Sequence, residues 1–387
     1  MTLGQGQQTQ LRGITWEHPR GYDCMVAAAA AYAKVTGVEV KWEHRSLQAF
    51  ADAPLDQLVT SYDLLVIDHP HVPGAAASGL LAQLDDAGYD TELALLTEQS
   101  VGASHRSYSL LGHQYGLASD AAAQVAAYRP DLLSEPPRDW AGVLDLAREG
   151  RVLWPAKPID AYSSLLTVAA NRGALPGADP GVFLAVEDAE RALEILHQLA
   201  NLVPARNLAD NPIQVAEMLS SDDRWVYAPL LFGYSNYSRR DFRQHRLRYV
   251  NIPAGPNGPI GSLLGGAGVA VSAYSGQLDA ARAFAFWVAS AEVQKGVYFD
   301  GGGQPGNRLA WEDDRLNAET LDFFRGTRAT LDGAYLRPRV ARYVEFQDLV
   351  SPLVTAALAG TVSDRELIDT LNKQAARLLE EVADADR

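Results

Sequence analysis

Three clusters of aromatic and polar side chains follow predicted strands and have the chemistry to bind a hydroxyl-rich molecule. They are Trp16–Glu17–His18, Asp68–His69, and the group Tyr234, Asn236 and Tyr237. Flat rings can lie against apolar C–H faces, while carboxylate, amide and imidazole groups exchange hydrogen bonds with hydroxyls. A charge-assisted bond from a hydroxyl to a carboxylate contributes about 1.5–3 kcal/mol. The residue types therefore predict recognition of a small polar ligand.

Each cluster also has a purely structural interpretation. Trp16 could pack under its own turn, and Asp68 could cap the turn that begins at Pro70. The two tyrosines of the third cluster could anchor their loop. The sequence leaves both interpretations open for all three clusters, and we carry ligand contact forward as the prediction.

Patterns typical of reactive sites are incomplete. Gly233–Tyr237 resembles part of a nucleophile elbow, but Tyr237 stands where that turn needs a second glycine. No glycine-rich phosphate loop with lysine is present. His69 and His71 flank a proline, and no further ligand at metal spacing completes a shell around them. We therefore expect no enzyme activity, no metal and no cofactor.

Length and composition fit a folded protein of two lobes. The chain has 387 residues, of which 47% are hydrophobic and 21% charged. Its net charge of −15 disfavours nucleic acid and anionic membranes as partners, because both would repel it. One basic segment, Arg239–Arg248, holds five arginines and His245. A solvated surface is its simpler interpretation, and an anion site is the alternative.

Export signals are not evident in the sequence. Met1–Gln10 is polar and lacks a basic flank followed by an apolar stretch. The apolar run Met25–Ala33 is too short to span a bilayer. Cys24, the single cysteine, lacks a lipoprotein cleavage sequence before it and cannot form an intrachain disulfide. Two possibilities remain: an exported protein whose signal has been removed, or a cytoplasmic binding protein.

The elements that must position the first two clusters alternate between strand and helix. We expect strands at Leu11–Trp16, Val38–Trp42 and Leu64–Ile67, a helix capped by Asp23, and another helix near Leu55–Tyr62. Leu64–Ile67 is apolar throughout, as in a parallel strand buried on both faces. Ligands of such sheets bind outside the carboxyl ends of the strands, which is where both clusters lie.

The second half of the chain repeats this logic. Glu187–Leu202 has helical spacing, and helices are also expected from Asp139 and from the capping box Ser363–Glu366. A largely apolar strand, Trp225–Phe232, leads directly to the third cluster. The strand-end argument places that cluster at the ligand site from the second lobe.

Val250–Gln294 carries the most specific pattern. A Pro253–Pro256 turn, the glycines of Gly265–Gly268 and a helical segment within Ser275–Gln294 follow one another. This order resembles the extracellular solute-binding proteins of carbohydrate ABC transporters, the maltose-binding-protein-like family 1. Further family-like segments appear in the expected order, and together they span most of the chain: Tyr62–Asp68, Gly112–Leu117, Pro136–Trp140, Gln304–Arg308 and Ala359–Gly360.

The resemblance implies an α/β two-lobe periplasmic-binding-protein fold of class II, with a ligand cleft between the lobes and a hinge of three crossings. It places residues 1–116 plus 265–308 in the amino-terminal lobe and residues 117–264 plus 309–387 in the carboxyl-terminal lobe. It adds candidate contacts to the three clusters: Trp154, Tyr162, Gly265, Gly266 and Gln304.

The function that the resemblance implies is binding of a sugar or sugar derivative and its delivery to an ABC transporter permease. It also implies a monomer in a periplasmic or other extracytoplasmic location. Two alternatives remain open: a cytoplasmic sensor or carrier of the same fold, and a glycoside-processing enzyme with paired acids.

Overall fold

The computed structural model describes residues 9–52, 55–86, 88–178 and 181–379. The segment 1–8, which contains most of the region where an export signal was sought, lies outside these ranges. The chain forms two compact units. Unit 1 contains Met1–Ser100, Ser104–Ala121 and Gly266–Ala310, and unit 2 contains Val101–Ala103, Ala122–Gly265 and Trp311–Arg387. The sequence-based boundaries fall after residues 116, 264 and 308, whereas the main changes of unit come after residues 121, 265 and 310.

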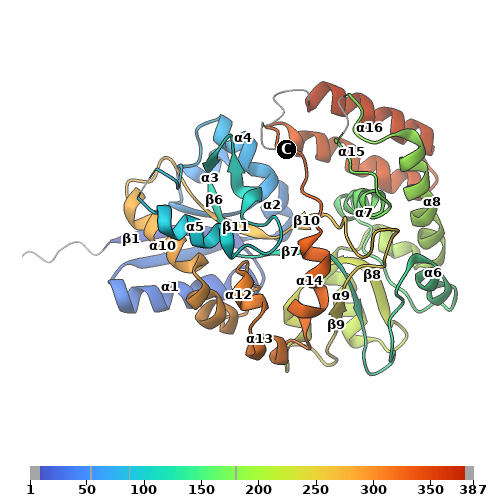
Figure 1. Ribbon diagram of the computed structural model, residues 1–387, viewed down its shortest axis with the longest axis horizontal. Coiled ribbons are helices and arrows are strands. Elements are labelled where there is room, and N and C mark those ends of the chain that lie inside the picture. The colour runs from blue at the N-terminus through green and yellow to red at the C-terminus, as the bar shows by residue number, and fades with distance from the viewer. Residues whose placement is uncertain (1–8, 53–54, 87, 179–180, 380–387) are drawn as a thin grey trace, which may run out of the picture. The chain divides into compact units, whose positions relative to one another are not determined.

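Unit 1 is built on a five-stranded sheet, of which β1, β6 and β11 are labelled in Figure 1. The strand order is β2-β1-β3-β11-β6. Strands β1, β2 and β3 are parallel, and β11 runs antiparallel to both β3 and β6. The strands are β1 (Gln10–Trp16), β2 (Glu39–Arg45), β3 (Leu64–Asp68), β6 (Gly116–Ala118) and β11 (Ala267–Val271), with a separate hairpin of β4 (Ser109–Leu110) and β5 (His113–Gln114).

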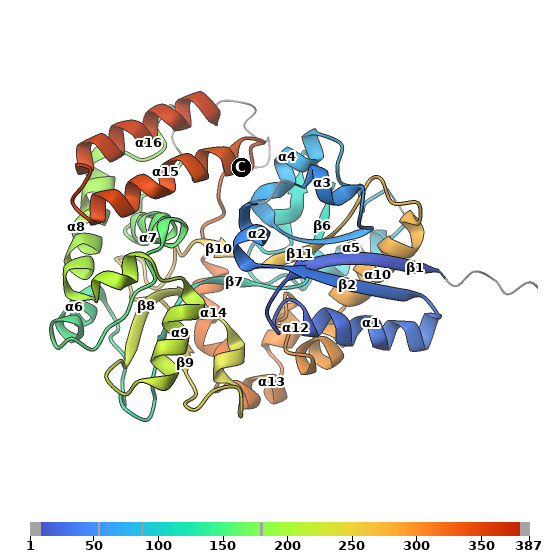
Figure 2. The same ribbon diagram turned by 180° about the vertical axis from the view of Figure 1, so that it is seen from behind.

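Helices cover both faces of this sheet, because alternate strand residues point to opposite sides. Leu64 and Val66 pack with α1 and α10, whereas Leu65 and Ile67 pack with α3 and α4. Figure 2 shows α1 on one side of the sheet and α3 and α4 on the other. The helices of unit 1 are α1 (Asp23–Thr36), α2 (Leu47–Asp52), α3 (Asp56–Val59), α4 (Val72–Ala77), α5 (Asp90–Glu98), α10 (Leu278–Ala289) and α11 (Ala291–Val293), with short turns η1 (His69–His71), η2 (Arg106–Tyr108) and η5 (Gln294–Tyr298). Helix α12 (Arg308–Trp311) leads out of the unit.

Unit 2 has a smaller antiparallel sheet centred on β7. Strand β8 pairs with one side of β7, and the short strands β9 and β10 pair with it at separate places. The strands are β7 (Ala122–Tyr128), β8 (Tyr227–Phe232), β9 (Arg248–Val250) and β10 (Leu264–Gly265).

One large apolar core joins this sheet to the helices of unit 2, with α7 packed against α8 and α15. The helices are α6 (Trp140–Arg148), α7 (Pro158–Asn171), α8 (Val186–Leu202), α9 (Pro212–Ser221), α13 (Asp314–Glu319), α14 (Phe323–Asp332), α15 (Tyr343–Leu358) and α16 (Asp364–Leu378), with turns η3 (Ala205–Leu208) and η4 (Ser235–Ser238). Among the described residues of both units, no helix combines the length and the apolar character needed to cross a bilayer.

Several local predictions can be checked against these bounds. The predicted cap of α16 is present, since the side chain of Ser363 accepts a hydrogen bond from the backbone N–H of Glu366 at 3.2 Å. The predicted cap of α1 is wrong: Tyr22 precedes the helix, and Asp23 lies in its first turn. The helix expected over Leu55–Tyr62 is reduced to the single turn of α3.

Candidate functional site

The carboxyl ends of three parallel strands meet at one edge of the sheet in unit 1. Strand β1 ends at Trp16, β2 at Arg45 and β3 at Asp68, and Trp16 is the register partner of Arg45. On the other side of β3, Ala267 pairs with Asp68, so Gly266 lies at the same edge. The structure therefore brings Trp16–Glu17, Asp68–His69 and Gly266 together although they are far apart in the chain.

Trp16 is buried, with 4% of its surface exposed. Its ring lies 4.9 Å from that of Phe50, and a Cβ atom on Gly21 would fall 2.3 Å from the indole. The tight turn after β1 thus requires glycine because the indole fills the space beneath it. This geometry is the structural interpretation of Trp16. The indole N–H is nevertheless buried without a hydrogen-bond partner in the described part of the chain.

Glu17 and His18 occupy the turn that follows. The backbone N–H of Glu17 donates to the carbonyl of Arg45 at 2.8 Å, and its carboxylate side chain is exposed. His18 is half-buried, and its Nδ1 accepts a hydrogen bond from the backbone N–H of Arg20 at 3.0 Å. Of these two side chains, Glu17 is the one that water reaches most freely.

Asp68 is half-buried at the end of β3. Its carboxylate makes no capping hydrogen bond to the turn η1, so the structural interpretation considered for it does not apply. His69 is 2% exposed, and its ring meets that of Tyr108 edge-on at 6.3 Å. Within the described ranges, no group of three or more His, Cys, Asp or Glu side chains is placed to hold a metal ion.

Arg45 is a candidate residue that the sequence analysis missed. The prediction ended β2 at Trp42, but the strand continues for three residues and leaves Arg45 beside Trp16 and Asp68. Burial lowers the pKa of Arg45, and the charge of Asp68 opposes that shift. Its Nε and Nη1 are buried without hydrogen-bond partners among the described residues, and its Nη2 reaches only the carbonyl of Phe50 at 3.5 Å. The strand-end rule would have found Arg45 had the strand boundary been right.

A buried ion pair reinforces this edge. Arg20, in the turn after β1, donates through Nε and Nη2 to the two carboxylate oxygens of Asp120 at 2.7 and 2.5 Å. The Arg20 and Asp120 side chains are 5% and 0% exposed. Burial raises the pKa of Asp120, and the guanidinium only partly counteracts this. The pair ties the turn after β1 to the segment after β6.

The glycines that join the two units have structural reasons to be glycine. A Cβ atom on Gly265, in β10, would lie 2.7 Å from the ring of Phe232. Gly266 has φ +99°, which residues with side chains rarely adopt, and its carbonyl accepts a hydrogen bond from the hydroxyl of Tyr108 at 3.3 Å. Gln304 is fully buried, and its side-chain amide donates to the carbonyl of Ala121 at 2.9 Å. Ligand contact by these residues stays a prediction.

Trp154 and Tyr162 lie in the core of unit 2, and neither is exposed. The indole N–H of Trp154 donates to the hydroxyl of Ser164 at 3.0 Å. The hydroxyl of Tyr162 lies 2.7 Å from that of Tyr343, and burial raises the pKa of Tyr162 well above its ordinary value. Both side chains are fully engaged within their own unit.

The third cluster follows β8, as predicted: Tyr234 immediately precedes the turn η4, and Asn236 and Tyr237 lie within it. Tyr234, Asn236 and Tyr237 are only 7%, 1% and 1% exposed. The hydroxyl of Tyr237 donates to the carboxylate of Glu217 at 2.7 Å, and its ring meets Phe242 edge-on at 5.2 Å. Tyr237 therefore anchors its turn, which is the structural interpretation.

Asp160, in the first turn of α7, is a second candidate residue that the sequence analysis did not include. It is 3% exposed, and burial raises its pKa to about 8, against the opposing charge of Lys157. Its backbone carbonyl is 3.5 Å from the side-chain amide of Gln124, which is the register partner of Phe232. Asp160 therefore lies near the carboxyl end of β8, with Tyr234 and Gly265. The acid is visible in the sequence, but its burial is not.

The basic segment Arg239–Arg248 is largely engaged with protein groups. Arg243 pairs with Glu217 at 2.6 Å, and Arg248 pairs with Asp322 at 3.2 Å. Arg246 donates to the backbone carbonyls of Ser238 at 2.6 Å and of Glu319 at 2.9 Å. These contacts hold the segment to its unit and leave fewer cations for an anionic ligand than the composition suggested.

Comparison with known proteins identifies the same family that the sequence motifs resemble. A family model described as bacterial extracellular solute-binding protein matches residues 27–319. Similar solved structures include a maltose-bound MalE3 of T. maritima, with a TM-score of 0.83 and 17% identity over 96% of this chain and 100% of that one.

Two further structures match as well. A solute-binding protein of an ABC transporter from Agrobacterium radiobacter K84, in complex with ribitol, has a TM-score of 0.81 and 21% identity over 96% of this chain and 98% of that one. The GacH receptor of Streptomyces glaucescens, solved unliganded and with acarbose, has a TM-score of 0.80 and 18% identity over 97% and 100%. At these identities the matches show the fold, and the predicted two-lobe α/β fold class is confirmed.

Proposed function

The chain belongs to the bacterial extracellular solute-binding proteins, and we propose that it binds a sugar or polyol at the carboxyl edge of the sheet in unit 1. The family is one of binding proteins that act outside the cytoplasm. Similar structures hold maltose, ribitol and acarbose, all of them rich in hydroxyls. Binding without chemical change is the activity that we propose.

The observation that carries the proposal is the convergence of Arg45, Asp68 and Glu17 at one edge. A guanidinium offers donors only, whereas carboxylates accept. A sugar hydroxyl can both donate and accept, so one hydroxyl can accept a hydrogen bond from the guanidinium and donate another to a carboxylate. Arg45 has donors that its own unit does not use, and Asp68 does not cap the turn beside it. These groups are the strongest candidates for ligand contact.

The candidate residues in unit 2 are weaker candidates for ligand contact than those in unit 1. Tyr234, Asn236 and Tyr237 are buried by contacts within their unit, so a ligand would reach them only at their edges. Trp154 and Tyr162 have no exposed surface, so a ligand would reach them only after a local rearrangement. Asp160 joins this group because a buried acid that holds its proton near pH 7 can donate a hydrogen bond to a ligand oxygen. We rank these residues below Asp68 and Arg45.

Binding is tested by thermal unfolding with a panel of sugars, polyols, sugar acids and phosphodiesters. A ligand at about 100 times its dissociation constant stabilises the folded protein by roughly 2.7 kcal/mol. We expect sugars or polyols to give the shift. A shift with sugar acids or phosphodiesters alone would transfer the proposal to anionic ligands.

The site is tested with Asp68→Asn and Arg45→Met, followed by calorimetric titration with the active sugar. Loss of one charged hydrogen bond of about 1.5–3 kcal/mol weakens binding roughly 10- to 150-fold. Asp279→Asn is the matched control, because this exposed acid lies in the first turn of α10, beyond the opposite end of antiparallel β11. Equal affinity of Asp68→Asn and Asp279→Asn would contradict the proposed site.

Delivery to an ABC transporter permease, action as a monomer and absence of turnover complete the proposal. Sedimentation tests the monomer, and incubation with chromogenic glycosides tests for turnover. We also expect ligand to draw the two lobes together, as a hinge between them would allow. X-ray scattering tests it, because closure lowers the radius of gyration and unchanged dimensions at saturating sugar would contradict it.

A further inference from the structure

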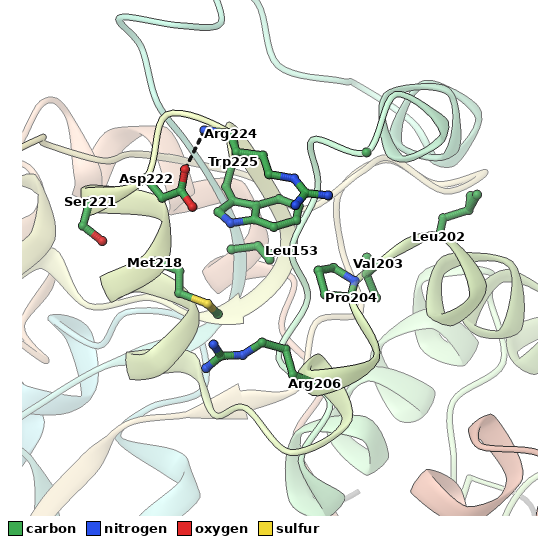
Figure 3. Close-up of a pocket in the computed structure, with 11 residues that line it drawn as sticks. Leu153, Leu202, Val203, Pro204, Arg206, Met218, Ser221, Asp222, Arg224 and Trp225 are labelled. Carbon is green, nitrogen blue, oxygen red and sulfur yellow. Dashed lines mark hydrogen bonds between the residues drawn. The ribbon is translucent and has the colours of Figure 1, made fainter.

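A hollow of about 640 Å³ opens in unit 2 at the amino-terminal end of β8 (Figure 3). The carboxyl ends of α8 and α9, the turn η3 and the residues just before β8 surround it. Trp225 lies two residues before β8, and Tyr234 follows the other end of the same strand. The hollow is thus separate from the candidate ligand residues of unit 2, and none of them lines it.

The floor of this hollow is apolar and its rim is charged. Leu153, Val203 and Trp225 are 0%, 8% and 7% exposed, and Met218 is half-buried beside them. Arg206 and Arg224 are exposed at the rim (Figure 3). An apolar floor beneath charged groups suits a ligand that has one apolar part and one charged part.

The two arginines at the rim make different contacts with the protein. Arg206 donates through Nε and Nη2 to both carboxylate oxygens of Asp210, each at 3.0 Å. Arg224 instead lies over the ring of Trp225, with its Cζ 4.4 Å from the ring centroid. No carboxylate lies within ion-pair distance of Arg224 in the ranges that the structure describes. Its guanidinium is therefore positioned by the indole while its donors face outward.

The charges at the hollow favour an anion. Asp210 compensates the charge of Arg206, so among the described residues Arg224 is the lining cation without an ion-pair partner, in a chain whose net charge is −15. The Asp222 carboxylate accepts the backbone N–H of Arg224 at 2.9 Å, which turns one of its oxygens toward the chain (Figure 3). The carboxyl ends of α8 and α9 carry partial negative charge and, with Asp222, would attract a cation. A cation would bind over the face of the Trp225 ring, however, and Arg224 already covers that face.

We propose that this hollow binds a small organic anion that carries an aromatic ring or a short aliphatic chain. The apolar part lies on Pro204, Met218 and the exposed edge of Trp225, and the carboxylate or sulfonate pairs with Arg224. The site is a second one, distinct from the proposed sugar site, and its occupant differs in chemistry from a sugar.

The test is a fluorescence titration of the intact protein with 8-anilinonaphthalene-1-sulfonate, followed by displacement with hexanoate. We expect one saturable site. Arg224→Glu should weaken binding at least tenfold, because it replaces the pairing cation with an anion, and Arg224→Lys should retain most of it. Arg240→Glu makes the same charge change at an exposed position outside the hollow and should leave binding unchanged.

The proposal would be overturned by no saturable binding, by equal affinity of wild type and Arg224→Glu, or by equal losses in Arg224→Glu and Arg240→Glu. Displacement by hexylammonium as effective as that by hexanoate would likewise show that the site does not select anions. Unchanged thermal midpoints confirm that both exposed substitutions preserve the fold. Unaltered binding of the active sugar by Arg224→Glu separates this site from the proposed sugar site.

Discussion

Breaking the buried pair of Arg20 and Asp120 is expected to destabilise unit 1 strongly. In Arg20→Met the carboxylate of Asp120, which has no exposed surface, loses both hydrogen bonds from the guanidinium. Removing one partner of a buried ion pair typically costs about 3–5 kcal/mol. For a unit of this size each 1 kcal/mol lowers the thermal midpoint by about 2–4 °C, so the expected drop is roughly 6–20 °C.

The pH dependence of this loss has a definite sign. Burial already raises the pKa of Asp120, and the loss of Arg20 removes the charge that holds that pKa down. A raised pKa in the folded state gives stability that is present at low pH and declines as pH rises through that pKa. The deficit of Arg20→Met should therefore be larger at pH 8 than at pH 5.

Thermal unfolding followed by circular dichroism at both pH values measures these effects. Arg12→Met is the control, because Arg12 pairs with Glu43 at 2.8 Å with about half of each side chain exposed, and solvent screens such pairs. The double variant Arg20→Met/Asp120→Leu should recover part of the loss, since no buried charge is left unpaired. A midpoint of Arg20→Met within 2 °C of wild type, or strictly additive losses in the double variant, would refute the reasoning.

Three further predictions concern the core and the junction between the units. Asp160→Asn should be more stable than wild type at pH 8 and lose that advantage toward pH 4, because the folded pKa of Asp160, about 8, exceeds its ordinary value of 3.8. In urea unfolding, the difference in unfolding free energy between variant and wild type should grow by up to about 1.4 kcal/mol per pH unit as pH rises. A pH-independent difference would contradict burial as the cause. Gly266→Ala should lower stability by about 1–3 kcal/mol, because φ is +99° there; a midpoint equal to wild type would show that the backbone relaxes. Tyr162→Phe and Tyr343→Phe should each lower the free energy of unfolding by about 1–3 kcal/mol, because each leaves the other buried hydroxyl unpaired. The double variant should lose less than the sum of the two single losses. Additive losses would show that the two hydroxyls do not form a hydrogen bond.

The candidate site shows how far strand patterns reach. Leu64–Ile67 reads as buried on both faces, and its residues do pack alternately against two sets of helices. That prediction was enough to put Asp68 at the end of a parallel strand. Arg45 escaped because the alternation in Val38–Trp42 does not continue into the more polar residues after it, while backbone pairing with β1 carries the strand on to Arg45.

The aromatic residues show where patterns stop being informative. Trp16, Trp154 and Tyr237 have the right chemistry for a ligand site, yet each is covered by a residue distant in the chain or by the fold of its own turn. The partner of Trp154 is Ser164, and that of Tyr237 is Glu217. A ring beside polar residues looks the same in sequence whether it faces water or a neighbouring helix.

The sequence by itself determined the alternation of strands and helices, the family and the edge of the sheet at which polar residues gather, because these depend on periodicity and on residues close in the chain. Tertiary structure alone decided how deeply each of those residues is buried and which groups it meets. Burial and pairing depend on groups from distant segments, so only the folded chain distinguishes Asp68, which does not cap its turn, from Asp120, whose carboxylate is held by Arg20.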